Sequence, residues 1–166
     1  IASEFRYRSP ILDESTLTIV ISQSGETSDT LAALKEAKRL GSKTMAITNV
    51  VGSSIAREAD QVVYTWAGPE IAVASTKAYT TQLITVFMLA TYMAGLKETI
   101  SADYAKSLIS SLRKVPAQIS EILEDVEPIK TFAQQYGFNE DVFFIGRSLD
   151  YAVALEGSLK LKEISY

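Results

Sequence analysis

A polar segment, Ser22-Gln23-Ser24-Gly25-Glu26-Thr27, offers three hydroxyl groups and a carboxamide within six residues. It follows the β-branched run 17–22 and precedes an amphipathic stretch, so we expect it to join a buried strand to a helix N-terminus. Ligands of parallel sheets bind at the carboxyl ends of strands, and free helix N–H groups attract anions. Gly25 would let the backbone approach an anionic oxygen closely. The segment is therefore predicted to hold a phosphate with uncharged donors.

A second interpretation of the same segment stays open. It lacks the Gly-Lys-Ser/Thr ending of a Walker loop and the three-glycine spacing of a dinucleotide-binding turn. Its hydroxyl groups would also suit a polar turn whose only task is to cap a helix. The segment by itself does not decide between phosphate binding and capping.

Charged side chains near the end of the chain form a second candidate set. Glu156, Lys160 and Glu163 recur at positions i, i+4 and i+7, and this spacing places them on one face of a helix. The pattern alone favours an exposed ladder of salt bridges.

Composition narrows the chemistry that these residues can perform. Sixteen Lys and Arg stand against twenty Asp and Glu, for a net charge of -4, so we expect no nucleic-acid partner. The chain has no cysteine and no histidine, which excludes disulfides and thiolate sites and removes the commonest transition-metal ligands. We expect neither a metal nor another cofactor.

No segment of the sequence is predicted to enter a membrane. The longest apolar stretch, 83–94, is too short to span a bilayer, and no signal peptide precedes the predicted fold. We expect a cytoplasmic protein.

Strands and helices alternate along the first part of the chain. Strands are predicted over 17–22, 43–48 and 61–66, and helices follow them near 28–40, 55–59 and 76–94. This alternation is typical of an α/β domain with a doubly wound parallel sheet.

The pattern changes after residue 96. Apolar residues at helical spacing predict two or three amphipathic helices over 97–140, with Pro116 in a first turn and Pro128 breaking or kinking a helix. Val142 to Ile145 is predicted to be another buried strand, with a helix from about Tyr151.

The phosphate segment resembles the phosphosugar loop of the sugar isomerase (SIS) domain family. That family has a three-layer, flavodoxin-like αβα fold, and its loop hydroxyls and amides hold a sugar phosphate. The positions that match here are Ser22, Gln23, Ser24 and Thr27. The resemblance implies three parts: 1–96 as a first SIS unit without its first strand, 97–140 as a helical connector, and 141–166 as the start of a second unit.

Three further segments resemble one branch of that family, the glucosamine-6-phosphate synthases. They are 1–8, 68–82 and 155–166, so the resemblance covers the chain in order. It implies that Val73 and Ser75 line the sugar site. It also implies that Glu163 moves a proton between C1 and C2, with Lys160 beside the substrate. One carboxylate suffices for this ketose-to-aldose step if burial and a nearby cation tune its pKa. Glu156 is expected to be structural.

The implied reaction joins fructose 6-phosphate and ammonia from glutamine into glucosamine 6-phosphate, in a homodimer with a glutaminase domain. The family's ring-opening histidine and Schiff-base lysine would lie beyond Tyr166. We therefore expect this chain, at best, to bind a hexose phosphate, and we expect it not to turn the sugar over. A fructosamine-phosphate deglycase and a non-catalytic sugar-phosphate sensor are the alternatives.

The resemblance also carries a structural hypothesis. SIS sheets have the strand order 2-1-3-4-5, and residues 1–4 would end the second strand, so that an interior strand is missing. We expect the strand 142–145 to fill that place beside 17–22, within one chain or by exchange between two.

Overall fold

The computed structural model describes residues 1–165. These residues form two compact units, 1–93 and 94–165. Tyr166, the last residue of the predicted segment 141–166, lies outside the described residues. No helix among residues 1–165 has the length and hydrophobicity needed to cross a membrane.

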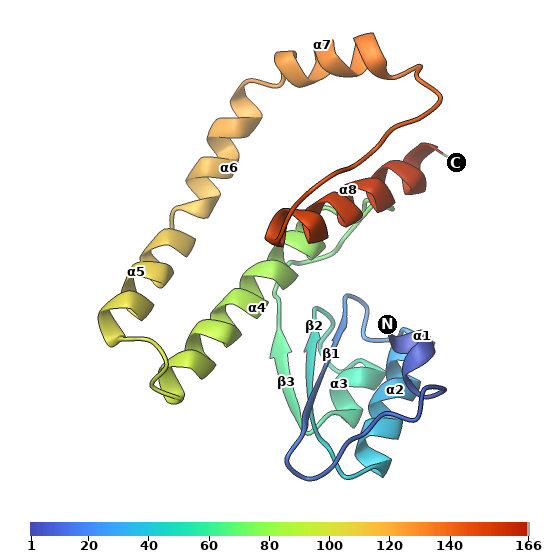
Figure 1. Ribbon diagram of the computed structural model, residues 1–166, viewed down its shortest axis with the longest axis vertical. Coiled ribbons are helices and arrows are strands. Elements are labelled where there is room, and N and C mark those ends of the chain that lie inside the picture. The colour runs from blue at the N-terminus through green and yellow to red at the C-terminus, as the bar shows by residue number, and fades with distance from the viewer. Residues whose placement is uncertain (166) are drawn as a thin grey trace. The chain divides into compact units, whose positions relative to one another are not determined.

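The first unit contains a parallel sheet of three strands in the order β1-β2-β3 (Figure 1). They are β1 (Leu17–Ser22), β2 (Lys43–Thr48) and β3 (Gln61–Tyr64). The register places Ser22 beside Thr48 and Thr48 beside Tyr64. The carboxyl ends of all three strands therefore meet at one edge of the sheet.

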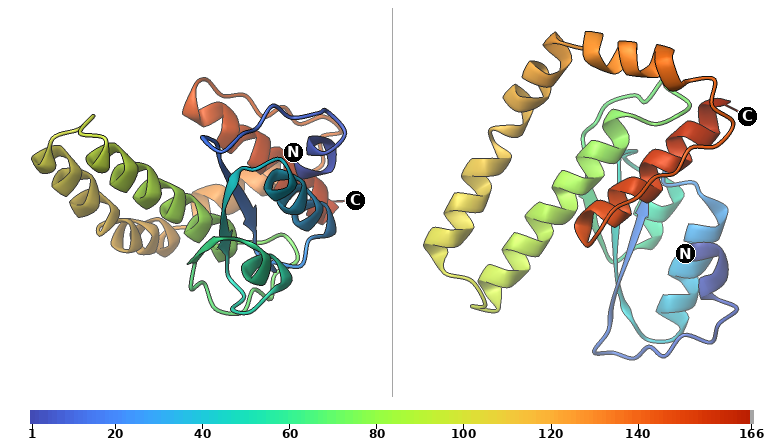
Figure 2. Two further views of the ribbon diagram at one scale, coloured as in Figure 1. Left: turned by 90° about the horizontal axis from the view of Figure 1, so that it is seen from below. Right: turned by 45° about the horizontal axis from the view of Figure 1, so that its top comes forward.

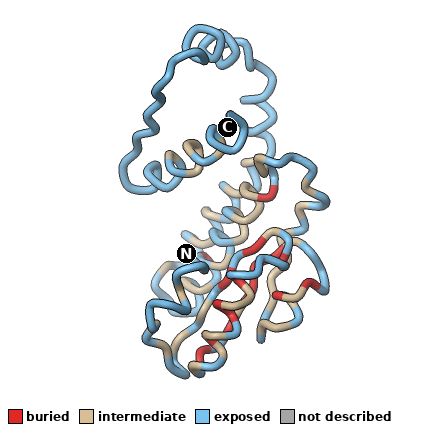
Figure 3. The backbone as a smooth tube through the Cα atoms, turned by 90° about the vertical axis from the view of Figure 1, so that its right-hand side faces the viewer, coloured by how far each residue is buried: buried red, intermediate tan, exposed pale blue. Residues whose placement is uncertain are grey.

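Helices accompany these strands in alternation. The first unit contains α1 (Ala2–Phe5), α2 (Ser28–Arg39), α3 (Ser54–Glu58) and most of α4 (Lys77–Leu96). The buried residues lie mainly in the strands and in α2 (Figure 3). Leu34 of α2 and Ile55 of α3 are fully buried against Val20 and Ala46 of the sheet. The predicted α/β class with a parallel sheet is confirmed.

Two details of the first unit differ from the prediction. The third strand ends at Tyr64 instead of residue 66, because Trp66 adopts a left-handed φ of 53° that a strand does not accommodate. Residues 1–4 were predicted to end a strand, but Ala2–Phe5 form a helix. A strand needs a neighbour for its N–H and C=O groups, whereas this turn pairs its own, as the Tyr7 N–H donates to the Glu4 carbonyl at 3.1 Å.

The second unit is helical in the described residues. Its helices are α5 (Ala102–Leu112), α6 (Val115–Glu124), α7 (Glu127–Tyr136) and α8 (Leu149–Ser165). The region 97–140 thus contains three helices, which follow one another with short bends between them (Figures 1 and 2). Pro116 and Pro128 lie in the first turns of α6 and α7, where proline costs no helical hydrogen bond.

The prediction of a strand at Val142 to Ile145 is wrong. This segment is neither helix nor strand, and β1 pairs only with β2 in the described part of the chain. The hypothesis that 142–145 lies beside 17–22 is therefore wrong for pairing within one chain, and exchange between two chains stays a prediction. The β-branched and aromatic side chains suit a strand, but a strand is stable only when a second one completes its ladder.

Candidate functional site

The loop 22–27 lies at the carboxyl end of β1, directly before α2. Ser22 is buried, and its Oγ lies 2.9 Å from Oγ1 of Thr27. The Gly25 N–H donates to the Ser22 hydroxyl oxygen at 3.1 Å. These two bonds close the loop into a compact turn. Only one of the two hydroxyl hydrogens is used between Ser22 and Thr27, so the other can be donated to a ligand.

Ser24 and Gln23 provide further donors. The Ser24 Oγ accepts the Glu26 N–H at 3.2 Å, which leaves its own hydroxyl hydrogen unused in the described contacts. The Gln23 carboxamide oxygen is buried without a hydrogen-bond partner in residues 1–165. The amide nitrogen of that side chain is then the group that can face a ligand. The predicted donors are thus not consumed by the fold.

The N-terminus of α2 distinguishes between the two interpretations of the loop. Thr27 occupies the N-cap position, yet its side chain makes no capping hydrogen bond. The first bond across this end joins the Leu31 N–H to the Thr27 carbonyl at 2.9 Å. First-turn N–H groups without a capping side chain are the groups that bind anions at helix ends. The geometry favours phosphate binding over capping.

Gly25 is required where the loop meets the start of α3. Its φ is +67°, and a Cβ added there would lie 2.0 Å from the Ser53 Oγ and 2.9 Å from the Thr48 Oγ1. The Gly25 carbonyl accepts the Ile55 N–H at 2.9 Å. A residue with a side chain could not keep this approach. The loop is therefore fixed against α3 by its backbone.

Glu26 places a negative charge in a loop predicted to hold an anion, and the structure shows its role. Its Oε1 accepts the Ser54 N–H at 2.7 Å, in the first turn of α3. Hydrogen bonding from Ser54 lowers the pKa of the Glu26 carboxyl. The carboxylate thus binds a helix N-terminus and ties the loop to α3. No sequence signal predicted this role, since the two residues are 28 positions apart.

Asn49 connects the end of β2 to the segment that follows β3. Its Oδ1 accepts the Ala67 N–H at 2.8 Å, and its Nδ2 donates to the Gly68 carbonyl at 2.8 Å. The Asn49 N–H also donates to the Gln23 carbonyl at 3.2 Å. Asn49 was not among the predicted residues, although its place directly after a strand is a signal for the ligand edge of a parallel sheet.

Val73 and Ser75 lie in the loop between β3 and α4. Val73 is 92% exposed, so its side chain makes almost no packing contacts. Ser75 has a left-handed φ of +52°, which is strained for a residue other than glycine. Exposed apolar groups and strained backbone are features that ligand loops share.

The second unit carries the charged set on α8. The Lys160 Nζ lies 2.5 Å from the Glu163 Oε2 and 3.5 Å from the Glu156 Oε1. The hydrogen bond with Glu163 is the main cause that raises the pKa of Lys160. The predicted ladder of salt bridges is therefore present. It engages one Glu163 oxygen, and the other has no partner in the described contacts.

Contacts within the second unit also position α8. A Cβ added at Gly157 would lie 3.0 Å from the Phe144 ring, so that glycine makes room for the aromatic side chain. A Cβ at Gly146 would lie 2.4 Å from the Asp150 carbonyl at the start of the helix. Glycines thus allow the segment before α8 to lie close to it.

Residues 1–92 match the family model of the SIS domain. Over its whole length the chain is 64% identical to the glutamine–fructose-6-phosphate aminotransferase (isomerizing) of Caldanaerobacter subterraneus subsp. tengcongensis, and 60% identical to that of Clostridium tetani. The chain spans 27% of the length of each relative. The C-terminal domain of glucosamine-fructose-6-phosphate aminotransferase from Francisella tularensis matches with a TM-score of 0.96 at 41% identity. That match covers 100% of this chain and 47% of the other.

Proposed function

The chain belongs to the SIS domain family, and from this premise we propose that it is a phosphosugar-binding isomerase module. The module would serve an enzyme that converts fructose 6-phosphate and glutamine-derived ammonia into glucosamine 6-phosphate. The observation that carries this proposal is the loop 22–27, with unused hydroxyl donors beside an uncapped helix N-terminus. The names of the relatives support the aminotransferase over a deglycase or a sensor.

The proposed ligand contacts divide between two loops of the first unit. Ser22, Gln23, Ser24 and Thr27 would hold the phosphoryl group, with help from the first-turn N–H groups of α2. Val73 and Ser75 would line the sugar. Because the donors are uncharged, the affinity for the phosphoryl group would depend on geometry and would be weakly sensitive to salt.

Glu163 is the proposed acid and base that moves a proton between C1 and C2. Lys160 holds one of its oxygens at 2.5 Å, which leaves the second oxygen to reach the substrate carbons. Lysine is a cation at neutral pH at its ordinary pKa, and the hydrogen bond with Glu163 raises the pKa of Lys160 further. Such a cation would stabilise the negative charge that develops on the sugar oxygen during the proton transfer. Glu156 would support Lys160 from the other side, at 3.5 Å.

Several properties of the enzyme follow from the same proposal. It would work as a cytoplasmic homodimer with a glutaminase domain that supplies ammonia. The 166 residues contain no histidine, so we expect the isolated chain to bind hexose phosphates without turning them over.

Calorimetric titration with three ligands tests the binding part of the proposal. Fructose 6-phosphate and glucosamine 6-phosphate should bind the chain, and fructose should show no measurable binding because it lacks the phosphoryl group. Equal binding of fructose, or no binding of either phosphate ester, would contradict the proposed function.

A further inference from the structure

Glu70 makes an unusual set of hydrogen bonds in the loop between β3 and α4. Its Oε1 accepts the Ala72 N–H at 3.3 Å, and its Oε2 accepts the N–H groups of Thr76 and Ala78, each at 3.1 Å. The hydrogen bond from the Ala78 N–H is the largest cause that lowers the pKa of the Glu70 carboxyl, and the bonds from Ala72 and Thr76 add to it. Both oxygens are thus engaged by the main chain.

These bonds close the loop into a ring. Thr76 and Ala78 stand at the start of α4, where N–H groups have no acceptor within their own helix. Glu70 supplies that acceptor from six and eight residues earlier in the chain. The backbone from 70 to 78 is therefore held at both ends by one carboxylate.

The ring contains Val73 and Ser75. Val73 is 92% exposed, so no packing of its side chain fixes its position. Ser75 keeps a left-handed φ of +52°, a conformation that costs about 1 kcal/mol or more for a residue other than glycine. Main-chain groups hold this loop instead: the Ser75 N–H donates to the Ala72 carbonyl at 3.1 Å, and Glu70 accepts the three bonds described above.

We infer that Glu70 is a positioning residue that fixes Val73 and Ser75 against the sugar part of a hexose phosphate. The inference rests on the proposed function. It adds that two different carboxylates fix the loop for the phosphoryl group and the loop for the sugar. Glu26 ties the phosphate loop 22–27 to α3 through Ser54, and Glu70 independently ties the sugar loop to α4. The two carboxylates share no hydrogen-bond partner.

Two ligands separate these roles. We would measure the affinity of the chain for fructose 6-phosphate and for inorganic phosphate, in the wild type and in Glu70→Ala. Without Glu70 the affinity for fructose 6-phosphate should fall about tenfold, equal to about 1.4 kcal/mol. The affinity for inorganic phosphate should stay within about twofold, because the phosphate loop is untouched. Glu26→Ala, the matched variant in the other loop, should lower the affinity for both ligands.

A conservative variant distinguishes positioning from a general loss of structure. The carboxamide oxygen of Glu70→Gln can still accept the N–H groups of Thr76 and Ala78, and only the bond to Ala72 is lost. This variant should therefore recover most of the affinity for fructose 6-phosphate, even if Glu70→Ala does not fold.

Three results would overturn the inference. One is a wild-type affinity for fructose 6-phosphate in Glu70→Ala. Another is an equal loss of affinity for both ligands in folded Glu70→Ala. The third is a Glu70→Gln variant that binds fructose 6-phosphate no better than Glu70→Ala. If the wild type binds neither ligand, the proposed function fails first and this inference fails with it.

Discussion

The two units of the chain organise their candidate functional residues in different ways. In the first unit, Leu34, Ile47 and Ile55 are fully buried around the sheet, and the phosphate loop is bonded to α3. In the second unit, α5 to α8 contain no buried residue in the described part of the chain (Figure 3). The phosphate loop is therefore fixed by tertiary contacts, whereas Glu163 and Lys160 are arranged mainly by their own helix.

The difference does not come from a lack of apolar residues in the second unit. Ile122, Leu123 and Phe132 lie on amphipathic helices, and each is more than 60% exposed. Helical stability in proteins comes mostly from packing of an apolar face, and these faces are not packed. A site becomes preorganised where apolar faces meet, as α2 and the sheet do in the first unit.

The largest expected effect comes from the core of the first unit. Leu34→Ala should lower the free energy of unfolding by about 3 kcal/mol, because a fully buried leucine leaves a cavity. Ile122→Ala, the matched change in the second unit, should cost less than about 0.5 kcal/mol. Urea unfolding followed by Trp66 fluorescence and by circular dichroism measures both. Equal losses of unfolding free energy in the two variants would show that the two units do not differ in how tightly their apolar side chains are packed.

The second prediction tests the backbone contact that fixes the phosphate loop. Gly25→Ala should destabilise the first unit by about 2 to 3 kcal/mol, since the new Cβ meets Ser53 in a left-handed conformation. Gly52 has a φ of +72° but nothing within 4 Å of its added Cβ, so Gly52→Ala should cost only about 1 kcal/mol. A Gly25→Ala variant as stable as Gly52→Ala would show that Ser53 does not confine the loop.

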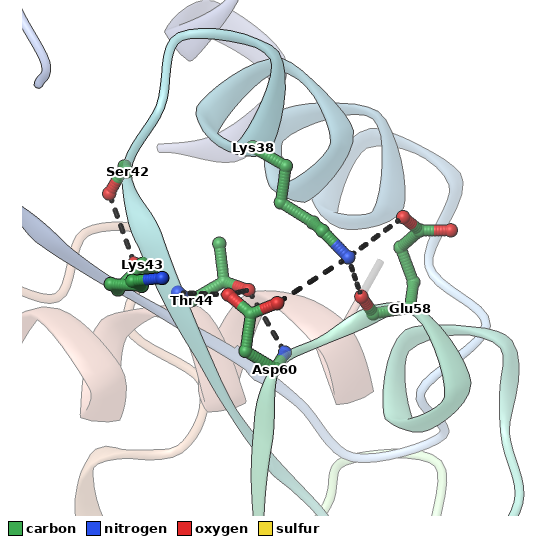
Figure 4. A network of polar contacts seen from close by, with 6 residues as sticks. All are labelled: Lys38, Ser42, Lys43, Thr44, Glu58 and Asp60. Atoms are coloured by element: carbon green, nitrogen blue, oxygen red, sulfur yellow. Dashed lines mark hydrogen bonds and ion pairs between the residues drawn. The ribbon is translucent and has the colours of Figure 1, made fainter. Parts of the chain in front are cut away.

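The third prediction concerns pH and the opposite end of the sheet, shown in Figure 4. The Thr44 N–H and hydroxyl donate to the Asp60 Oδ2 at 2.9 and 2.8 Å, and the Lys38 Nζ lies 3.6 Å from the Asp60 Oδ1. Hydrogen bonding from Thr44, with Lys38 as a smaller contribution, lowers the pKa of Asp60.

A lowered pKa in the folded state gives stability that is present above the ordinary aspartate pKa of about 3.9. That stability is lost as the pH falls from about 4 through the lower folded value. The unfolding midpoint of the wild type should therefore fall more between pH 6 and pH 3 than that of Asp60→Asn. Parallel pH profiles for the two proteins would refute this role of Asp60.

The smallest effect is expected in the second unit, at the ladder of salt bridges on α8. Lys160→Met removes two ion pairs from a helix without buried residues. The side chains of these pairs are only 24% to 34% exposed, but both pairs lie within one helix, and such pairs contribute little to stability. The unfolding midpoint should therefore move less than in any variant above. A shift as large as that of Leu34→Ala would mean that the ladder organises the second unit.

The sequence predicted the strands 17–22 and 43–48 with their observed bounds, because β-branched runs between turns are a local signal. The strands expected at 1–4 and 142–145 were wrong, since pairing depends on a partner strand that local propensity does not reveal. The position of the loop 22–27 between a strand and a helix was also predicted, and its phosphate-binding role stays a prediction. The roles of Glu26, Asn49 and Glu70 were not predicted, because each depends on main-chain groups that only folding brings near.

The most direct test of the account is a calorimetric titration of fructose 6-phosphate into four proteins: the wild type, Ser24→Ala, Thr27→Ala and the control Ser15→Ala. Loss of a hydrogen bond to a charged ligand should weaken binding about tenfold or more in the two loop variants. Ser15 lies before β1, at the other end of the strand, and its variant should bind like the wild type. Equal affinity in all four proteins would show that the loop 22–27 does not hold the phosphoryl group.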